Sequence, residues 1–528
     1  MQVAAGIDDL SLLVPSAGID RPTDWNTTFP AAMGTVFDGT GAPGVKADVH
    51  LKGDRVAAVG AVPKIDGAAE IDANGLYVCP GFIDLHTHCD NGPPSLTDKD
   101  GRPNRNYVSQ GVTTVVTGNC GSGPVDAARY FAALEAGGVG TNVVHQAPHN
   151  SIRQQVMGNE NRAPTADELK RMADLVETAL DAGAVGLATG LIYNPGTYAR
   201  TEEIAALAAV VGRRGGLYAS HIRNEGTGLL DAIAEAIRIG REGNCRVHIS
   251  HIKASGKAVW GKSAAAVALI DDARKKGVAV TADQYPYVAS STSLRATVVP
   301  SRYREGDQAD FVKRLDDPQV GPQLRKDIAA AVGGREGGAR IQIARYKANP
   351  KWQGKKLDAI ADAEKKDVAD IVVEIERNGG AQVVNFGMSE EDVRVYMRQP
   401  WVATASDGGV QLPGATVPHP RSYGTFPRKI GRYAIEEKLV PVELAVRSAS
   451  GLPADILKLT DRGYLKAGQF ADVVVFDPAT YRDAATFDRP HQYATGVKWV
   501  FVNGRPMIAD GRFDPAALAG RVLRFNKK

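Results

Sequence analysis

The sequence predicts an α/β protein: a parallel barrel of eight strand–helix units with a small β domain beside it. From about residue 80 to residue 451, short apolar runs alternate with helical patterns, which is typical of parallel strands joined by crossover helices. Eight of the runs fit as barrel strands, the number that closes a (β/α) barrel. At both chain ends the pattern changes to an alternation of period two, which predicts hairpins. The 528 residues can bury a large core of this kind.

The barrel elements are predicted in order from these runs and from helix-end signals. The eight candidate strands end near His88, Thr117, Val144, Ala188, His221, His251, Asp283 and Asp407. Thr165 and Glu168 form a capping box that opens an amphipathic helix to Ala182. Thr201 is expected to cap the next helix, which ends before the strand at His221.

A ninth apolar run, at 383–386, exceeds the count of eight strands. We expect it to follow a long insertion at about 288–380. Loops of this length are usually functional or have a structure of their own. The insertion is therefore predicted to fold over the barrel mouth as a lid or a small subdomain.

The chain ends are predicted to pair into one small β-sandwich domain. Residues 47–59 alternate around a turn at Gly53, and 471–476 and 497–502 are further candidate strands, the last followed by Asn503-Gly504. Chain termini commonly lie close together, so strands from both ends can share a sheet. The predicted domains are an N-terminal extension at 1–29, the β domain at 30–78 plus 464–528, and the catalytic barrel at 79–463.

Composition narrows the class of partner. The 63 Lys and Arg nearly balance the 60 Asp and Glu, and no basic run is present, which argues against a nucleic acid or an anionic membrane and favours a small-molecule substrate. Four cysteines are too few for a disulfide framework in this length. No apolar run is long enough to span a membrane, and the first twenty residues lack the pattern of a signal peptide, so we expect a cytoplasmic protein. The sequence says nothing about oligomeric state.

The strongest local signal for chemistry is the pair His86 and His88 at the end of the first barrel strand. Residues two apart on a strand point to the same side, so both imidazoles can enter one site. Alone, such a pair is equally well explained by surface or core histidines. It is joined by His221 and His251 at two further strand ends and by Asp407 at the last one, which is where catalytic groups lie in barrels of this type.

Imidazole and carboxylate are standard ligands of zinc, so these five residues predict a metal centre. Cys120, in a glycine-rich turn after another candidate strand, would add a thiolate, a soft and strong zinc ligand. The alternative for Cys120 is a small buried residue in a turn. Cys79, Cys89 and Cys245 have no comparable context and are interpreted as packing residues.

These motifs together resemble the amidohydrolase superfamily and, within it, the N-acyl-D-amino-acid deacylase (D-aminoacylase) family. The matching stretches are GTVFDGTGAP (34–43), PGFID (80–84), TGNC (117–120), GLIYNPGTY (190–198), SHIRNE (220–225), SHIK (250–253), DQYPY (283–287), SDG (406–408) and HPRSYGTFPR (419–428). They run in the family's order over nearly the whole chain. The resemblance implies a TIM-like metal-dependent hydrolase barrel and the cleavage of an N-acyl-D-amino acid to a carboxylate and a free D-amino acid.

Carried over by position, the resemblance assigns one tight zinc to Cys120, His221 and His251. His86, His88 and Asp407 would surround a second, weaker metal position. Zinc polarises an amide carbonyl and lowers the pKa of water from about 15.7 towards 7. Asp407 is the expected general base that takes the proton and returns it to the leaving nitrogen; its alternative role is metal ligation alone.

The substrate's free carboxylate calls for cations and hydroxyls. Candidate contacts are Tyr193, Lys253, Tyr287 and Arg421, each of which has a structural role as the alternative. Arg295 is a more speculative candidate and would hint at an acidic substrate.

The chain also departs from the family pattern. The lead at 1–29 is longer than usual, 30–33 stands where an apolar strand is expected, and Pro148-His-Asn150 replaces the common Gly-His-Gly.

Two other functions remain open at this point. One is a cyclic-amide hydrolase of the dihydroorotase or hydantoinase type, which would typically use a carbamylated lysine. The other is a metal-free binding protein that kept the fold.

Overall fold

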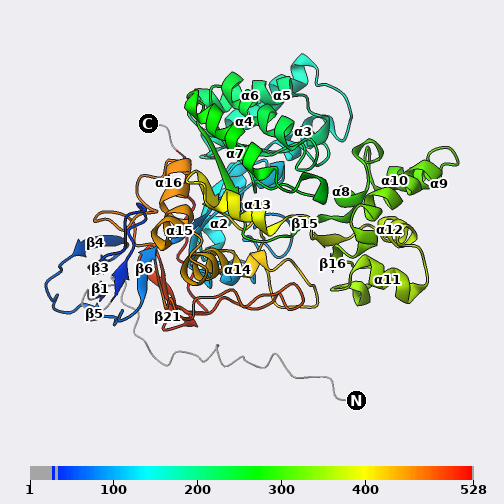
Figure 1. Cartoon of the computed structure of the whole chain (residues 1–528). Helices are drawn as coiled ribbons and strands as arrows, with labels where there is room; N and C mark the ends of the chain where they lie inside the picture. Colours follow the sequence, from blue (N-terminus) through cyan, green and yellow to red (C-terminus); the bar gives the residue numbers. More distant parts are fainter. Residues whose placement is uncertain (1–25, 30–33, 526–528) are drawn as a thin grey trace.

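The computed structural model describes residues 26–29 and 34–525 (Figure 1). Three regions follow one another across Figure 1: the β domain with β3 and β4 at one side, the barrel with its helices in the middle, and the segment with α9 to α12 at the other side. The metal-ligand candidates all belong to the middle region.

The middle region is a parallel barrel. Its strands are β7 (Phe82–Asp84), β8 (Val112–Thr117), β9 (Asn142–His145), β11 (Gly186–Gly190), β12 (Leu217–His221), β13 (Arg246–Ile249), β14 (Val280–Gln284) and β18 (Val402–Thr404). One run of neighbours is β7-β8-β9, and the other starts with the short β10 (Ala147–Pro148), one residue after β9, and continues through β11 to β14 and β18. The ring is completed between the last and first strands, where the Asp407 backbone N donates to His86 O at 2.8 Å. The predicted fold class is confirmed.

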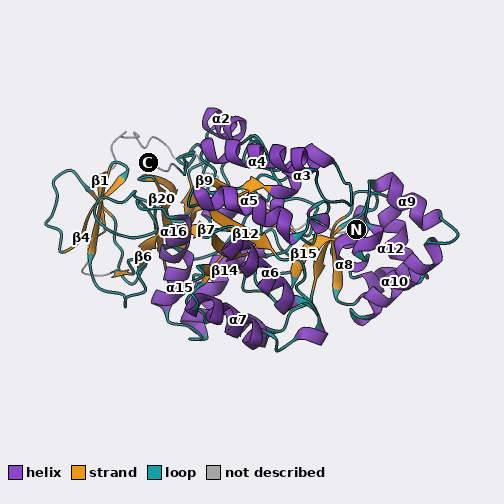
Figure 2. Cartoon of the chain, turned by 90° about the horizontal axis from the view of Figure 1, so that it is seen from above, coloured by secondary structure: helices purple, strands orange, loops and turns teal. Residues whose placement is uncertain are grey.

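Helices cover the outside of the barrel, as Figure 2 shows from above. They are α1 (Arg105–Val108), α2 (Ala127–Gly137), α3 (His149–Met157), α4 (Ala166–Asp181), α5 (Thr201–Arg213), α6 (Leu229–Glu242), α7 (Ser263–Lys275), α13 (Glu390–Met397), α14 (Arg421–Pro427), α15 (Val442–Ala449) and α16 (Gly451–Leu457). The predicted capping box of Thr165 and Glu168 is present at α4. The cap predicted at Thr201 is wrong: Thr201 is the first residue of α5, and its hydroxyl bonds to Glu235 on α6 at 2.8 Å, so it is not available to cap its own helix.

The barrel interior is apolar at one end only. Ile83, Val116 and Leu217 pack there against Leu452 and Ile456 of α16. This apolar cluster closes the amino-terminal end of the strands and leaves the opposite end for polar side chains. The chemistry is therefore confined to the carboxyl-terminal end of the barrel, as in other barrels of this type.

Two sheets form the β domain. The strands of one sheet are β4 (Arg55–Gly60), β3 (Asp48–Lys52), β1 (Asn26–Phe29) and β5 (Ala69–Glu70), in that order. Those of the other are β2 (Thr35–Val36), β6 (Tyr77–Pro80), β19 (Val473–Phe476), β20 (Val497–Val502), β21 (Arg505–Ala509) and β22 (Arg512–Phe513). Val49 and Leu51 of the first sheet share a core with Val473, Val475 and Phe501 of the second, so both chain ends contribute to one sandwich.

The N-terminal part of this domain extends further than the sequence indicated. β1 lies within 1–29, the stretch assigned to an extension, and pairs antiparallel with β3. The segment 30–33, where an apolar strand was expected, and residues 1–25 lie outside the described residues. The exact domain bounds remain predictions.

The ninth apolar run is β17 (Gln382–Asn385), which belongs to a separate three-stranded antiparallel sheet with β15 (Ser290–Ser293) and β16 (Ile341–Arg345). The same stretch of the chain contains the helices α8 (Leu294–Val298), α9 (Gln308–Asp316), α10 (Gly321–Gly333), α11 (Leu357–Glu364) and α12 (Val368–Arg377). Phe311, Ile328 and Ile371 belong to an apolar core of this segment's own. We call residues 290–385 the inserted segment.

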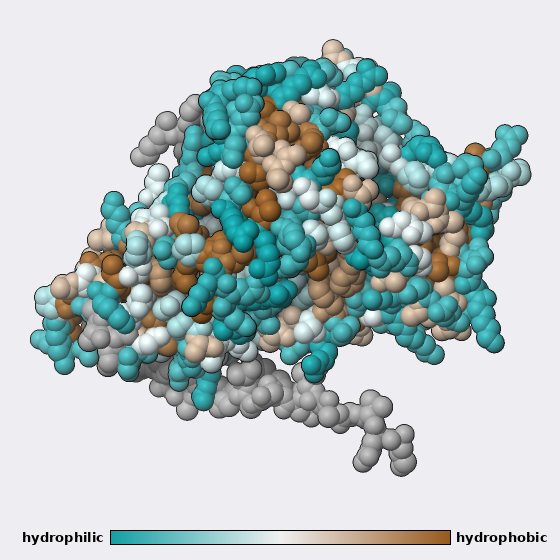
Figure 3. Space-filling model, viewed as in Figure 1, coloured by the Kyte–Doolittle hydropathy of each residue, from teal (hydrophilic) through white to brown (hydrophobic). Residues whose placement is uncertain are grey.

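The surface in Figure 3 is mostly hydrophilic, with several small hydrophobic areas over the barrel. In the described chain, the large hydrophobic side chains that are well exposed are Val45, Leu412 and Leu444. No helix among the described residues combines the length and the apolar character that crossing a membrane requires.

Candidate metal centre

The six predicted metal ligands meet at the carboxyl-terminal end of the barrel. Three histidine nitrogens surround the Cys120 sulfur: His86 Nε2 and His221 Nδ1 each lie 3.3 Å from Sγ, and His251 Nε2 lies 3.6 Å from it. Asp407 Oδ1 lies 3.6 Å from His86 Nε2 and 3.1 Å from His88 Nε2. Residues from five separate places along the chain thus form one cluster.

Three of these residues have backbone conformations that side-chain-bearing residues rarely adopt. The φ angles of Cys120, His251 and Asp407 are 52°, 36° and 53°. Such a conformation costs about 1–3 kcal/mol per residue and is found mostly at functional sites. The glycine after Cys120 is also required, because a Cβ on Gly121 would lie 2.2 Å from Asn150 Oδ1. The turn therefore holds the thiol towards the histidines at a local cost.

Each of the three histidines that face Cys120 has a carboxylate near its second ring nitrogen. His86 Nδ1 lies 3.5 Å from Asp283 Oδ2, and Glu225 Oε1 lies 3.1 Å from His251 Nδ1 and 3.6 Å from His221 Nε2. Asp283 also accepts the backbone N–H of His251 at 2.6 Å. Metal-ligating histidines usually donate their second ring nitrogen to a carboxylate or carbonyl in this way.

The electrostatics suit metal ligation. Burial lowers the pKa of His86 to about 4 and, together with the charge of His251, lowers the pKa of His221 well below its usual value. Both imidazoles are therefore neutral, as a ligand must be. Burial raises the pKa of the Cys120 thiol well above its usual range, an effect that a bound cation reverses by deprotonating the thiol. Burial raises the pKa of the Asp407 carboxyl group, but the electrostatic effects of Arg421 and His251 lower it by more. The pKa of Asp407 therefore lies well below its usual range.

The donor set fits zinc. The ligand atoms of His86, Cys120, His251 and Asp407 all lie within 4.8 Å of one another, and so do those of His221, Glu225 and His251. A thiol, neutral imidazoles and a carboxylate form the nitrogen, sulfur and oxygen set that zinc prefers. All members of the cluster except His88 are buried, and the carboxylates of Asp283 and Glu225 lie beside three of its histidines.

A cavity of about 630 Å³ opens from this cluster. His88, Cys120 and Asp407 lie in its wall, together with Tyr193 and Arg421. Arg421 Nη1 donates to Asp407 Oδ2 at 2.7 Å, and its Nη2 donates to Ser291 O at 3.2 Å. Tyr193 stacks edge-on against His221, with the ring centres 4.9 Å apart. These two predicted substrate contacts are therefore positioned to meet a molecule bound at the metal-ligand cluster.

The other three predicted substrate contacts lie elsewhere. Lys253 Nζ is 2.6 Å from Glu225 Oε1 and 2.6 Å from His251 Nδ1, so it lies behind the cluster. Tyr287 is buried with its ring 4.6 Å from the Arg428 guanidinium. Arg295 is in the inserted segment and pairs with Glu376 at 2.7 Å. None of these three side chains lines the cavity of the metal-ligand cluster.

Two residues near the cluster were given no role by the sequence reasoning. Glu225 follows His221 by four positions, and Asp283 is at a strand end like the ligands themselves. The strand-end position was a usable signal for Asp283. For Glu225 the signal was weak, because it lies in the loop between β12 and α6.

The barrel and the ligand cluster together define a metal-dependent hydrolase. Residues 69–508 match the amidohydrolase family, and the chain belongs to that family, as the sequence motifs implied. The chain is 38% identical to a D-aminoacylase of Alcaligenes xylosoxydans xylosoxydans, over 93% of this chain and 96% of that protein. It is 36% identical to an N-acyl-D-glutamate deacylase of the same organism, over 93% and 95%.

A solved structure shows the same likeness in three dimensions. The N-acyl-D-glutamate deacylase of Bordetella bronchiseptica, in complex with zinc and a phosphonate inhibitor that mimics the tetrahedral intermediate, superposes with a TM-score of 0.79 at 34% identity. The match covers 95% of this chain and 99% of that chain.

Proposed function

We propose that this chain is a zinc-dependent deacylase that hydrolyses the amide bond of N-acyl-D-amino acids to a carboxylate and a free D-amino acid. The observation that carries the proposal is the convergence of His86, His221 and His251 on the Cys120 sulfur at 3.3–3.6 Å. Two of the full-length relatives are a D-aminoacylase and an N-acyl-D-glutamate deacylase, and they supply the substrate class.

Cys120, His221 and His251 would hold the tight zinc. His86, His88 and Asp407 would hold a second metal more weakly. The second position is supported by the distances of Asp407 Oδ1 to His86 Nε2, 3.6 Å, and to His88 Nε2, 3.1 Å. Zinc, when bound, polarises the amide carbonyl and makes water a better nucleophile at neutral pH.

Asp407 acts as the general base and acid in this proposal. Its low pKa keeps it ionised at neutral pH, so it can accept the proton of water. It then returns the proton to the amide nitrogen as the carbon–nitrogen bond breaks. Arg421 holds Asp407 Oδ2 in place at 2.7 Å, which leaves Oδ1 directed at His86 and His88.

Arg421 and Tyr193 would bind the substrate. The guanidinium has five N–H groups, of which two are engaged with Asp407 and the Ser291 carbonyl, so others remain for the substrate's α-carboxylate. The preference for the D configuration is inferred from the relatives. A cytoplasmic location remains a prediction from the sequence.

The test measures the release of free amino acid by zinc-loaded protein from matched N-acetyl-D- and N-acetyl-L-amino acids, with dihydroorotate and hydantoins alongside. We expect hydrolysis of D substrates, at least about 100-fold faster than L, and none of the ring amides. Removal of zinc by a chelator should abolish the activity, and added zinc should restore it. Hydrolysis of the ring amides alone would refute the proposal in favour of a cyclic-amide hydrolase.

A further inference from the structure

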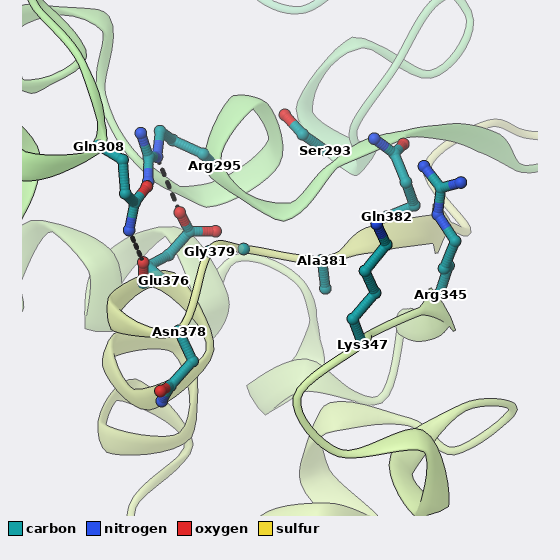
Figure 4. A pocket seen from close by; sticks show the side chains of 11 residues that line it. Ser293, Arg295, Gln308, Arg345, Lys347, Glu376, Asn378, Gly379, Ala381 and Gln382 are labelled. Carbon is teal, nitrogen blue, oxygen red and sulfur yellow. Dashed lines mark hydrogen bonds and ion pairs between the residues drawn. The ribbon is translucent and has the colours of Figure 1, made fainter. Parts of the chain in front are cut away.

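The inserted segment brings a row of polar side chains to the wall of the active-site cavity. Ser293 of β15 pairs in register with Gln382 of β17, which in turn pairs with Arg345 of β16. All three line both the 630 Å³ cavity of the metal-ligand cluster and an adjoining cavity of about 480 Å³. Figure 4 shows Gln382 and Arg345 extending from the same side of their sheet. We call Ser293, Gln382 and Arg345 the cross-strand row.

The row lies within reach of a molecule bound at the metal-ligand cluster. Arg421, which pairs with Asp407, donates to the carbonyl of Ser291, and Ser293 is two residues further along β15. Two residues of a strand span about 7 Å. A side chain that branches from a substrate held by Arg421 and runs along β15 therefore directs its end group at the row.

Arg345 is the charged member of the row, and its charge is not compensated locally. In the described part of the chain, no hydrogen bond, ion pair or ring contact engages its guanidinium. The other non-histidine charges in the wall of the cluster's cavity are Asp407 and Arg421, which neutralise each other at 2.7 Å. Arg345 is thus the free charge that a substrate side chain meets in that cavity.

Arg295 is less suited to the same task. Its Nε lies 2.7 Å from the buried Glu376 carboxylate (Figure 4). Its guanidinium lies over the Phe311 ring at 4.2 Å. These two contacts hold the Arg295 guanidinium outside the wall of the cavity that opens from the metal-ligand cluster. Arg295 also lines only the adjoining cavity.

We propose that Arg345 selects substrates with an anionic side chain, so that this chain acts preferentially on N-acyl derivatives of acidic D-amino acids. The inference rests on the proposed deacylase function. A carboxylate at the end of the substrate side chain binds the Arg345 fork, with the Gln382 amide and the Ser293 hydroxyl beside it. A neutral side chain of the same size leaves the guanidinium without a partner.

The experiment compares kcat/KM for N-acetyl-D-glutamate and N-acetyl-D-glutamine, which differ in charge and not in size, using zinc-loaded full-length protein. N-acetyl-D-aspartate and N-acetyl-D-methionine complete the panel. The wild type should favour glutamate over glutamine at least about tenfold, and Arg345→Gln should reduce that ratio about tenfold or more. Arg345→Lys, which keeps the charge without the fork, should give an intermediate ratio.

Lys347→Gln is the matched control, because Lys347 is a neighbouring exposed cation that lines only the adjoining cavity. It should leave the glutamate-to-glutamine ratio within about twofold of the wild type. Zinc content and far-UV circular dichroism of each variant establish that it is folded and loaded.

Three results would overturn the inference about Arg345. They are a wild type that prefers glutamine or methionine, a ratio unchanged in Arg345→Gln, and a ratio that collapses in Arg295→Gln or Lys347→Gln instead. Absence of hydrolysis for every N-acetyl-D-amino acid would be a failure of the proposed function and is distinct from all three.

Discussion

Glu225 and Lys253 form a partly buried ion pair next to the metal-ligand cluster, with Lys253 Nζ 2.6 Å from Glu225 Oε1. The same carboxylate oxygen faces His251 Nδ1 at 3.1 Å and His221 Nε2 at 3.6 Å. Lys253 and the two histidines together hold the pKa of Glu225 low despite its burial. One carboxylate thus orients two of the three imidazoles that face Cys120.

Replacement of Glu225 by Gln should weaken zinc binding. The amide keeps the size of the side chain but removes the charge that orients and strengthens the two imidazole ligands. We expect zinc affinity to fall by about 10- to 100-fold. Competition with a chromophoric chelator measures it. Glu235→Gln is the control, because Glu235 pairs with Arg223 at 2.9 Å away from the cluster; equal affinities in the two variants would contradict the role assigned to Glu225.

Removal of the Cys120 thiol should remove the tight zinc. Its sulfur is the atom on which three histidine nitrogens converge, so Cys120→Ala deletes a ligand of the proposed tight site. Zinc affinity should fall by more than about 100-fold, and deacylase activity should fall with it. Elemental analysis after dialysis measures the zinc. Cys245→Ala, which changes a thiol far from the cluster, should keep wild-type zinc content; full retention of zinc in Cys120→Ala would show that the thiol is not a ligand.

Asp407→Asn should separate catalysis from metal binding. The amide cannot act as a base, so kcat should fall by about 10²- to 10⁴-fold, while Cys120, His221 and His251 retain the tight zinc. Single-turnover kinetics and zinc analysis on the same preparation test both halves of this prediction. An active variant would exclude Asp407 as the base, and a variant without zinc would assign it ligation as its main role.

Lys429 should make stability depend on pH. Burial lowers the pKa of this lysine to about 7, and its Nζ donates to the Met397 carbonyl at 3.0 Å. In the unfolded chain a lysine keeps its proton up to a pH of about 10.4. Between the two values the unfolded state binds more protons, so this group destabilises the fold most at and below pH 7, and its contribution to stability rises with pH up to about 10.4.

The variant Lys429→Met should therefore melt at a higher temperature than the wild type at pH 7. The difference between the two melting temperatures should shrink as the pH is raised to 10. Scanning calorimetry at a series of pH values measures it. Lys326→Met, which alters an exposed lysine of α10, should show no pH-dependent difference from the wild type. A gap for Lys429→Met that is constant between pH 7 and 10 would mean that the pKa of Lys429 is the same in the folded and unfolded chain, and so that burial does not lower it.

The sequence by itself determined the features of this protein that depend on residues close to one another along the chain. The period of the apolar runs predicted the barrel strands, and the alternation around Gly53 predicted the hairpin of β3 and β4. His86, His88, His221 and His251 could be identified as candidate ligands because each lies at or just past the end of a run. The position of a strand end depends on neighbouring residues and is visible without a structure.

Tertiary structure decided which polar side chains face one another. Lys253 and Arg295 have the charge expected of substrate contacts, but ion pairs with Glu225 and Glu376 hold both side chains outside the wall of the active-site cavity. Arg345 has no such partner among the described residues, and it reaches the active-site cavity because β16 and β17 pair in the inserted segment. Whether a charge is free or paired depends on contacts between distant parts of the chain, and spacing along the sequence does not specify those contacts.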